Sequence, residues 1–211
     1  MPAKYRLTYF PAKGRGEMTR LIFHAARVPF VDRRLTSEEW KDFKPKTPMG
    51  MLPVLETPDG MFCESGAIAR WAARKFGLYG KTDSDELMVE AIVTQGQELR
   101  EKQIIPLMFE KDPETKEEKK KKALEEVEKV LNWWEKNVVQ TPSTEKTYSY
   151  TVGHQLTAGD LALLDVSENL QRLIQLDMSR WPRLMAVINT VSALPGLKEY
   201  LAEREKMTFV V

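Results

Sequence analysis

The chain has 211 residues, of which 42% are hydrophobic and 30% charged, a composition typical of a soluble globular protein with one large domain or two small ones. Its formal net charge of +1 gives no reason to expect nucleic acid or an acidic membrane surface as a partner. The only cysteine, Cys63, excludes a disulfide within the chain, and there is neither a signal-peptide core nor a run of about 18 apolar residues, so we expect a cytoplasmic protein.

The first elements predicted along the chain are a short strand at Tyr5–Phe10, a tight turn over residues 14–16 and a helix. From Met18 onward, apolar residues recur at the i, i+3, i+4, i+7 spacing of one helix face. Tyr9 is therefore predicted near the end of a strand, close to the positively polarised start of a helix. Its hydroxyl would be well placed to act on a ligand held there, although an ordinary strand tyrosine fits the same pattern.

Strand and helix signals continue to about residue 78. The further elements expected in this part are strands at Phe30–Leu35, Leu52–Glu56 and Met61–Cys63, and a helix that begins at Ser65. Residues 36–46 are predicted to be polar and irregular, with Trp40 and Phe43 as their only large apolar side chains. The resulting order is β-α-β followed by β-β-α.

Pro53 is unusual inside a predicted strand, because proline removes a backbone donor and is normally confined to edges or bulges. A cis peptide bond before Pro53 would account for its position, since the resulting bend exposes backbone N–H and C=O groups to a ligand. We therefore predict that the peptide bond between Leu52 and Pro53 is cis.

The chain changes character after residue 78, where a linker precedes segments that are helical by their apolar period. Thr82 is a good N-cap for a helix that runs to about Phe109, and Thr157 with Asp160 forms a near relative of a capping box. Further helices are expected from Pro113, Pro182 and Pro195, and a polar loop at Gln140–Tyr150. The pattern thus predicts an α/β half followed by an all-α half.

Five segments of the chain carry a family resemblance. In order they are LTYFPAKGRGE (7–17), Trp40 with Lys44, MLPVLE (51–56), ESGAIARWAARKFGLYGKT (64–82) and VGHQLTAGDLALL (152–164). Together they resemble the cytosolic glutathione S-transferases, most closely the sigma class, which includes S-crystallins and haematopoietic prostaglandin D synthases. The resemblance implies a thioredoxin-like glutathione-binding domain at residues 1–78. It also implies an all-helical domain at residues 82–211 that lines an electrophile pocket and a dimer interface.

The resemblance implies that glutathione is a co-substrate and that Tyr9 and Arg15 are the catalytic residues. A hydroxyl that donates to the glutathione sulfur favours the thiolate, which then attacks a small hydrophobic electrophile or opens a peroxide, as in detoxification. No metal is needed for this chemistry, and His24 and His154 lack a surrounding set of metal ligands. Disulfide exchange is not expected, because there is no Cys-x-x-Cys motif.

The resemblance also implies which residues bind glutathione. Trp40 and Lys44 match the pair that holds the glycine end, where a lysine meets a carboxylate. Met51 and Leu52, just before Pro53, match the segment whose backbone pairs with the cysteinyl unit in the manner of an added strand.

At the other end of the tripeptide, Ser65 matches the helix-start serine that receives the γ-glutamyl carboxylate. Glu64 accepts from the γ-glutamyl amine, although the sigma class usually has glutamine there. Gln97 stands where the prostaglandin synthases have an aspartate that reaches the amine across the dimer, so it would act as a neutral amide. Because the accompanying aspartate cluster is absent, no divalent metal site is expected. Thr157 and Asp160 match a capping motif that serves folding.

The electrophile pocket is expected to be lined by Phe10, Leu99, Ile104, Ile105 and Met108. Three functions stay open: a conjugating transferase, a non-catalytic structural protein of the S-crystallin type, and a glutathione-dependent prostaglandin D isomerase. The retained glutathione-site residues favour the transferase. The expected partners are glutathione, small hydrophobic electrophiles and a second copy of the chain in a homodimer, with no nucleic acid and no membrane.

Overall fold

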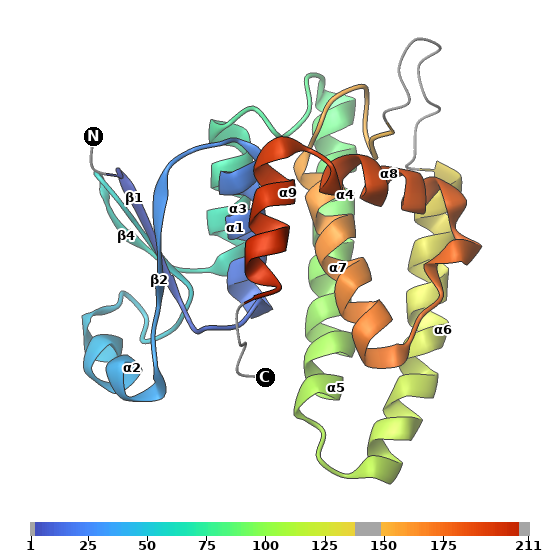
Figure 1. Ribbon diagram of the computed structural model, residues 1–211, viewed down its shortest axis with the longest axis horizontal. Coiled ribbons are helices and arrows are strands. Elements are labelled where there is room, and N and C mark those ends of the chain that lie inside the picture. The colour runs from blue at the N-terminus through green and yellow to red at the C-terminus, as the bar shows by residue number, and fades with distance from the viewer. Residues whose placement is uncertain (1–2, 138–148, 207–211) are drawn as a thin grey trace. The chain divides into compact units, whose positions relative to one another are not determined.

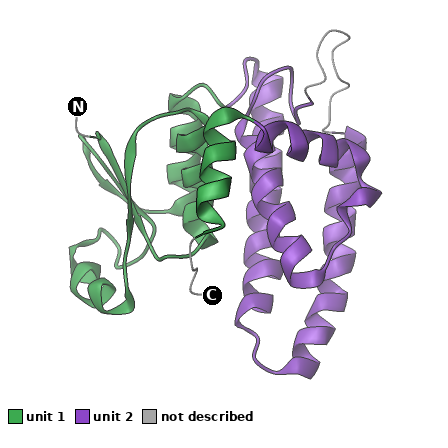
Figure 2. Cartoon of the chain, in the orientation of Figure 1, with its two compact units in different colours: residues 1–78, 194–211 green, residues 79–193 purple. Residues whose placement is uncertain are grey.

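A computed structural model of the chain describes residues 3–137 and 149–206. The chain divides into two compact units, one formed by residues 1–78 with 194–211 and the other by residues 79–193 (Figure 2). Most of the predicted polar loop at Gln140–Tyr150 lies outside the described residues. Among the helices that are described, none is both long enough and apolar enough to cross a bilayer.

The first unit is built on a four-stranded mixed sheet in the order β2-β1-β3-β4 (Figure 1). Its elements are β1 Tyr5–Tyr9, α1 Glu17–Ala25, β2 Phe30–Arg34, α2 Ser37–Phe43, β3 Val54–Thr57, β4 Gly60–Phe62, α3 Ser65–Lys75 and α9 Pro195–Arg204. Strand β1 runs parallel to β2, whereas β3 pairs antiparallel with both β1 and β4. This confirms the predicted β-α-β and β-β-α order of a thioredoxin-like domain.

The core of this unit lies where α1 and α3 pack on one side of the sheet (Figure 1). Leu7 of β1 pairs in register with Leu55 of β3, and both are fully buried. Leu21 and Ile22 of α1 and Ala72 of α3 are buried as well. The predicted apolar face of α1 is therefore a face that fills the core.

Residues 36–46, predicted to be irregular, instead contain α2 and a one-turn 3-10 helix at Lys44–Lys46. Helix α2 begins with a complete capping box. The Thr36 hydroxyl accepts from the Glu39 N–H at 3.2 Å, and the Glu39 carboxylate accepts from the Thr36 N–H at 2.7 Å. The prediction was wrong because this box satisfies two donors at the helix start and compensates for the shortage of apolar residues.

A buried group of charges ties α9 to α1. Glu17, at 0% exposure, accepts from Tyr200 Oη at 2.9 Å, from Arg20 at 3.2 Å and from Arg204. Burial acts to raise the pKa of Glu17, but the charges of Arg20 and Arg204 outweigh burial and lower it. The carboxylate is therefore ionised at neutral pH, and Tyr200 and Arg204 of α9 belong to its immediate surroundings.

The second unit is all-helical in its described part. Its helices are α4 Asp83–Leu99, α5 Ile105–Phe109, α6 Pro113–Asn137, α7 Ala158–Ile174 and α8 Pro182–Ser192. The helix predicted to run to Phe109 does so through a π-helical segment at Arg100–Ile104. Pro106 has no N–H with which to close the regular helical bond to Lys102, and this favours a wider turn there.

Helix α7 begins at the predicted capping motif. Asp160 accepts from the Thr157 N–H at 2.6 Å, from the Thr157 hydroxyl at 3.0 Å and from the Thr151 N–H. The side chain is completely buried, and burial raises the pKa of Asp160 to about 6, although these hydrogen bonds act in the opposite direction. Helix α4 also begins with a complete capping box, between Thr82 and Asp85, so both predicted helix starts are confirmed.

Substitution Asp160→Asn is expected to remove a pH dependence of stability. The folded-state pKa of about 6 exceeds the unfolded value of about 3.9, so the folded state holds the extra proton between these values. The free energy of unfolding of the wild type should therefore fall, by up to about 3 kcal/mol, as the pH rises from about 4 to 6 and then level off. Asparagine has no proton to lose, so this decline should be absent.

The measurement is denaturant unfolding of both proteins at several pH values between 4 and 8. Glu125→Gln, on the exposed face of α6, is the matched control and should keep the wild-type decline. A decline that persists unchanged in Asp160→Asn contradicts the assignment.

Candidate functional site

Tyr9 is the last residue of β1, and the turn after it wraps around its ring. The side chain is 9% exposed, and its Oη accepts a hydrogen bond from the backbone N–H of Arg15 at 3.2 Å. A Cβ added at Gly14 would lie 2.7 Å from this Oη, and one added at Gly16 would lie 2.9 Å from Tyr9 Cδ1. Only glycine leaves room for the ring at both positions, and Gly14 also has a φ of +41°. The turn therefore fixes the direction of the hydroxyl.

The Tyr9 hydroxyl remains able to donate a hydrogen bond. Its oxygen accepts from Arg15, and no acceptor for its hydrogen is present in the described part of the chain. A phenol that accepts from a backbone N–H still has its own hydrogen to give to an anionic atom. The geometry at Tyr9 is thus that of a donor without an internal acceptor.

Arg20 supports the same turn, although the sequence analysis did not single it out. Its fully buried guanidinium donates to the carbonyl oxygens of Ala12 at 2.8 Å and Phe10 at 3.4 Å, and its centre lies 5.8 Å from the centroid of the Tyr9 ring. An arginine in an amphipathic helix is normally expected to reach solvent. The sequence feature that could have indicated a buried Arg20 was Glu17, an acid three residues earlier on the same helix with which it pairs.

Aromatic contacts connect Tyr9 with α2. The Phe10 ring lies edge-on to both the Tyr9 ring, at 5.6 Å between centroids, and the Trp40 ring, at 6.0 Å. Lys44 comes four residues after Trp40, at the end of α2, and a Cβ at Gly50 would lie 3.5 Å from its Cε. Helix α2, which the sequence patterns did not predict, therefore presents Trp40, and the 3-10 helix that follows it directly presents Lys44.

Two unusual backbone positions flank β3 and β4. The peptide bond between Leu52 and Pro53 is cis, as predicted, and half-buried Met51 precedes it. Glu64 has φ 73° and ψ 99°, a conformation that non-glycine residues rarely adopt and that clusters at functional sites. Ser65 begins α3, and within the described chain no side chain caps this helix start, so its first N–H groups can receive a carboxylate.

The remaining predicted site residues belong to the second unit. Gln97 and Leu99 lie on α4, Ile104 ends the π-helical segment, and Ile105 and Met108 lie on α5. Leu99 and Ile104 are buried, and the other three are half-buried. Their contribution to a ligand site stays a prediction. Over the described ranges, no three His, Cys, Asp or Glu side chains are grouped so that they could hold a metal ion.

Comparison with known proteins shows the family. Residues 17–82 match the model of the glutathione S-transferase N-terminal domain, and residues 98–204 match that of the C-terminal domain. Glutathione S-transferase 1 of Ascaris suum is 38% identical over 98% of this chain and 99% of its own length. The solved glutathione S-transferase of Ascaris lumbricoides has a TM-score of 0.82 at 37% identity, covering 95% of this chain and 97% of that one. The chain therefore belongs to the glutathione S-transferase family, and it is a glutathione transferase.

Other relatives bear on the class and on the alternatives. The sigma-class transferase of Fasciola hepatica has a TM-score of 0.82 at 28% identity and covers 95% of this chain and 96% of its own. S-crystallin SL11 of Nototodarus sloanii is 32% identical over 99% of this chain and all of its own length. The hookworm transferase Na-GST-3, described as monomeric, has a TM-score of 0.83 at 29% identity and covers 98% of this chain and 100% of its own.

Substitution Gly16→Ala is expected to lower the transferase activity about 10-fold or more with the fold retained. The added Cβ would lie 2.9 Å from the Tyr9 ring, so the ring and its hydroxyl must shift, and small misplacements of reacting groups are costly. The measurement is kcat/KM for conjugation of glutathione to a chlorinated nitrobenzene, with the melting temperature measured in parallel.

The matched control is Gly153→Ala. Gly153 also has a positive φ, of 60°, but a Cβ there meets nothing within 4 Å, so this variant should lose some stability and keep its activity. Equal activities of the two variants would show that the close contact at Tyr9 does not control turnover.

Proposed function

We propose that Tyr9 donates its hydroxyl hydrogen to the sulfur of bound glutathione and so stabilises the thiolate. The observation that carries this proposal is the fixed hydroxyl, which accepts from Arg15 N–H and has no acceptor of its own among the described residues. A free thiol with a pKa of about 8.5 is only about 3% ionised at pH 7. A charge-assisted hydrogen bond of about 2 kcal/mol lowers that pKa by about 1.5 units, which makes about half of it thiolate.

The thiolate then attacks the electrophilic carbon of a second substrate. The new bond joins sulfur to that carbon, and the leaving group departs with the electron pair of the broken bond. With a peroxide, the same sulfur forms a bond to one oxygen as the O–O bond breaks, and the other oxygen leaves with the electron pair as an alkoxide or hydroxide. The residues proposed to line the electrophile pocket are Phe10, Leu99, Ile104, Ile105 and Met108. We assign this chemistry to detoxification in the cytoplasm, a compartment that fits a chain with one cysteine.

Glutathione is proposed to lie along the first unit from α2 to α3. Trp40 and Lys44 hold its glycine carboxylate, and the backbone of residues 51–53 pairs with the cysteinyl unit. Ser65 and the uncapped start of α3 receive the γ-glutamyl carboxylate. Glu64, held in its strained conformation immediately before α3, accepts from the γ-glutamyl amine. Gln97 of a second protomer is proposed to reach the same amine.

The two alternatives share this glutathione site and differ in the step after glutathione has bound. A structural protein of the S-crystallin type would bind glutathione and turn over poorly, but the Tyr9 arrangement, with a hydroxyl fixed to donate, favours catalysis. A prostaglandin D isomerase would differ in the shape of the second pocket. The named transferases at up to 38% identity support conjugation as the primary activity.

We propose that the chain forms a homodimer whose interface includes the outer edge of the first unit as well as the helical unit. Phe62 of β4 and Trp71 of α3 are 49% and 37% exposed, and they line an apolar groove of about 190 Å³ together with Cys63. Paired apolar exposure of this kind marks contact surfaces in proteins. The monomeric hookworm relative shows that the fold alone does not require a dimer, so the oligomeric state has to be measured.

Substitution Tyr9→Phe is expected to lower kcat/KM for conjugation about 100-fold and to raise the pKa of enzyme-bound glutathione by about 1 to 2 units. The ring stays in place while the donor to the sulfur is lost. The thiol pKa is measured from thiolate absorbance in the ultraviolet as the pH is raised, with glutathione saturating.

Tyr5→Phe is the matched control, since Tyr5 lies on the same strand and packs edge-on against Phe23 at 5.4 Å without a role in the site. It should retain wild-type activity. Wild-type glutathione binding with negligible turnover would support the structural alternative, and isomerase activity is measured separately on the prostaglandin endoperoxide. An unchanged thiol pKa in Tyr9→Phe would refute the assigned role.

Substitution Phe62→Glu is expected to convert a dimer into a monomer of 24.3 kDa, because it places a charge in the apolar groove. Val31→Glu, at the opposite edge of the sheet and similarly exposed at 43%, should leave the dimer intact. Light scattering coupled to gel filtration measures the mass. A wild type that elutes as a monomer contradicts the proposed interface.

A further inference from the structure

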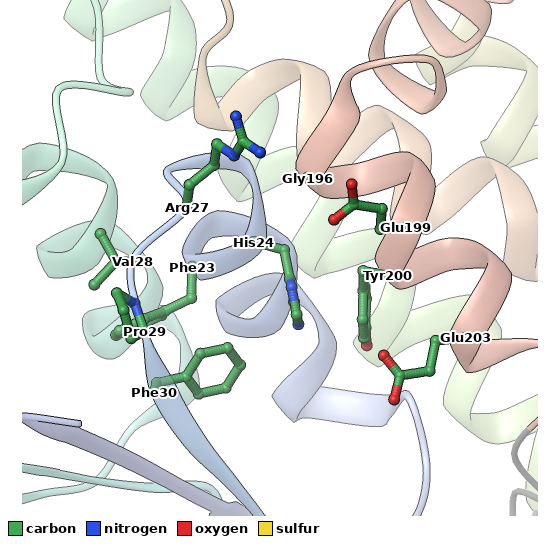
Figure 3. A pocket seen from close by; sticks show the side chains of 10 residues that line it. All are labelled: Phe23, His24, Arg27, Val28, Pro29, Phe30, Gly196, Glu199, Tyr200 and Glu203. Atoms are coloured by element: carbon green, nitrogen blue, oxygen red, sulfur yellow. The ribbon is translucent and has the colours of Figure 1, made fainter. Parts of the chain in front are cut away.

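Buried charges decide how helices pack in this chain, as the first unit shows. The Glu17 carboxylate accepts a hydrogen bond from Tyr200 at 2.9 Å, and the Tyr200 ring stacks on His24 of α1 at 4.1 Å between centroids (Figure 3). The face that α9 turns toward α1 is therefore fixed by a buried carboxylate. The helical unit has a buried ion pair of its own, between Arg100 and Asp165, which belongs to neither the glutathione site nor the electrophile pocket proposed above.

Asp165 lies in the buried face of α7, where an acid is unexpected. Its side chain is 0% exposed, and the adjacent Leu164 and Val166 are buried as well. Arg100 donates to one carboxylate oxygen, and Asn169 donates to the other at 3.3 Å. An apolar pair of similar size commonly gives a fold equal or greater stability than a buried ion pair. What the ion pair supplies is direction, because an arginine and a carboxylate hold one geometry whereas two apolar side chains can slide past each other.

Arg100 is also the first residue of the π-helical segment Arg100–Ile104. Its backbone carbonyl accepts from the Ile105 N–H, which closes the wide turn. Pro106 removes the regular helical bond at this point, but it does not select the geometry that replaces that bond. The Arg100 side chain is tied to α7 through Asp165, and α7 contacts both α4 and the π-helical segment. The contact with Asp165 therefore fixes the residue at which the wide turn begins.

The wide turn sets the direction of the side chains that follow it. A π-helical turn takes up one residue more than an α-helical turn, so it rotates the residues after it by about 100° relative to those before it. Leu99 and Met108, nine residues apart, would point to opposite sides of an uninterrupted α-helix. With the extra residue taken up, the angle between them falls to about 80°, which brings them toward one side. The wide turn is thus what allows residues of α4 and α5 to line one surface.

We propose that Arg100 and Asp165 are positioning residues for the electrophile pocket. Their ion pair fixes the wide turn, and the turn directs Leu99 and Met108 toward the bound electrophile. This inference rests on the proposed function, which places these two side chains in that pocket. Neither member of the pair touches a substrate, so loss of the pair changes which electrophiles are preferred and leaves thiolate formation at Tyr9 as it is.

The test uses 2-alkenals of increasing chain length, from trans-2-hexenal to trans-2-nonenal, with the full chain at pH 7. Glutathione adds to each of them in the same way: sulfur bonds to the β-carbon, the electrons of the C=C bond move toward the carbonyl group, and a proton is taken up at the α-carbon. Only the apolar tail differs, so the change in kcat/KM with chain length reports how well the pocket holds that tail. The wild type is expected to gain about 3-fold per added methylene, or about 30-fold across the series.

The first variant replaces the pair by apolar residues, Arg100→Met with Asp165→Leu. Asn169 keeps its second hydrogen bond, to the backbone carbonyl of residue 165 at 2.7 Å, so this double variant should have a melting temperature equal to that of the wild type or higher. Its gain across the series is expected to fall from about 30-fold to about 5-fold or less, with the KM for glutathione unchanged. A role in stability alone predicts the reverse, a lower melting temperature and an unchanged gain. A gain that stays at the wild-type value would refute the proposal.

A conservative variant and a control accompany it. Arg100→Lys keeps the charge but loses the forked geometry, so it should give an intermediate gain. It also decides the case in which the double variant fails to fold, since a folded Arg100→Lys protein with the wild-type gain overturns the proposal. The matched control is Glu98→Gln, which breaks an exposed ion pair with Lys102, at 3.2 Å, in the same stretch of helix and should leave the gain and the melting temperature unchanged.

Two further variants separate this proposal from those on which it rests. Met108→Ala should lower the gain while the ion pair stays intact. If Met108→Ala lowers it and the double variant does not, the pocket stands and the positioning role falls; if neither lowers it, the pocket assignment falls as well. Tyr9→Phe should slow conjugation of every alkenal by the same factor and preserve the gain, so failure of the proposed catalytic mechanism gives a different result.

Discussion

The buried contact between Glu17 and Arg20 is the interaction on which both the proposed site and the packing of α9 depend. Removing a charge from water costs several kcal/mol unless partners compensate it. Here the Glu17 carboxylate and the Arg20 guanidinium each have several such partners. Arg20 donates hydrogen bonds to the carbonyl oxygens of Phe10 and Ala12 beside Tyr9. The Glu17 carboxylate accepts a hydrogen bond from Tyr200 and pairs with Arg204, both on α9. A single ion pair therefore holds two parts of the first unit in place. One is the turn around Tyr9, the proposed catalytic residue, and the other is α9.

Most of the fold could be predicted from local patterns, since strands, turns and capped helices each have a signal of a few residues. The capping boxes at Thr82 and Thr157 and the cis bond before Pro53 are of this kind. Helix α2 was missed because it is short and has few apolar residues, although the box formed by Thr36 and Glu39 was readable. The packing of α9 on α1 was beyond such reasoning, because it rests on contacts between residues 183 positions apart.

The candidate site was predictable to a smaller degree. Tyr9 could be placed at a strand end next to a helix start, but its assignment to glutathione chemistry rested on family resemblance. No sequence pattern reveals that a side chain at position 14 or 16 would clash with Tyr9, so that both must be glycine. Nor does any pattern reveal that Glu64 adopts a backbone conformation with positive φ. These are properties of close packing and of backbone geometry, which depend on elements brought together only by the fold. Arg20 was missed for the related reason that its burial is decided by partners on other elements.

The distance along the chain between Glu17 and Tyr200 has a consequence for biosynthesis. The partners from α9 leave the ribosome 183 residues after Glu17, which at 5–20 residues per second is roughly 10 to 40 s. During this interval the nascent first unit has its sheet, α1 and Arg20, but it lacks two of the groups that compensate the Glu17 carboxylate. Completion of the N-terminal half of the enzyme therefore has to wait for translation of its last helix.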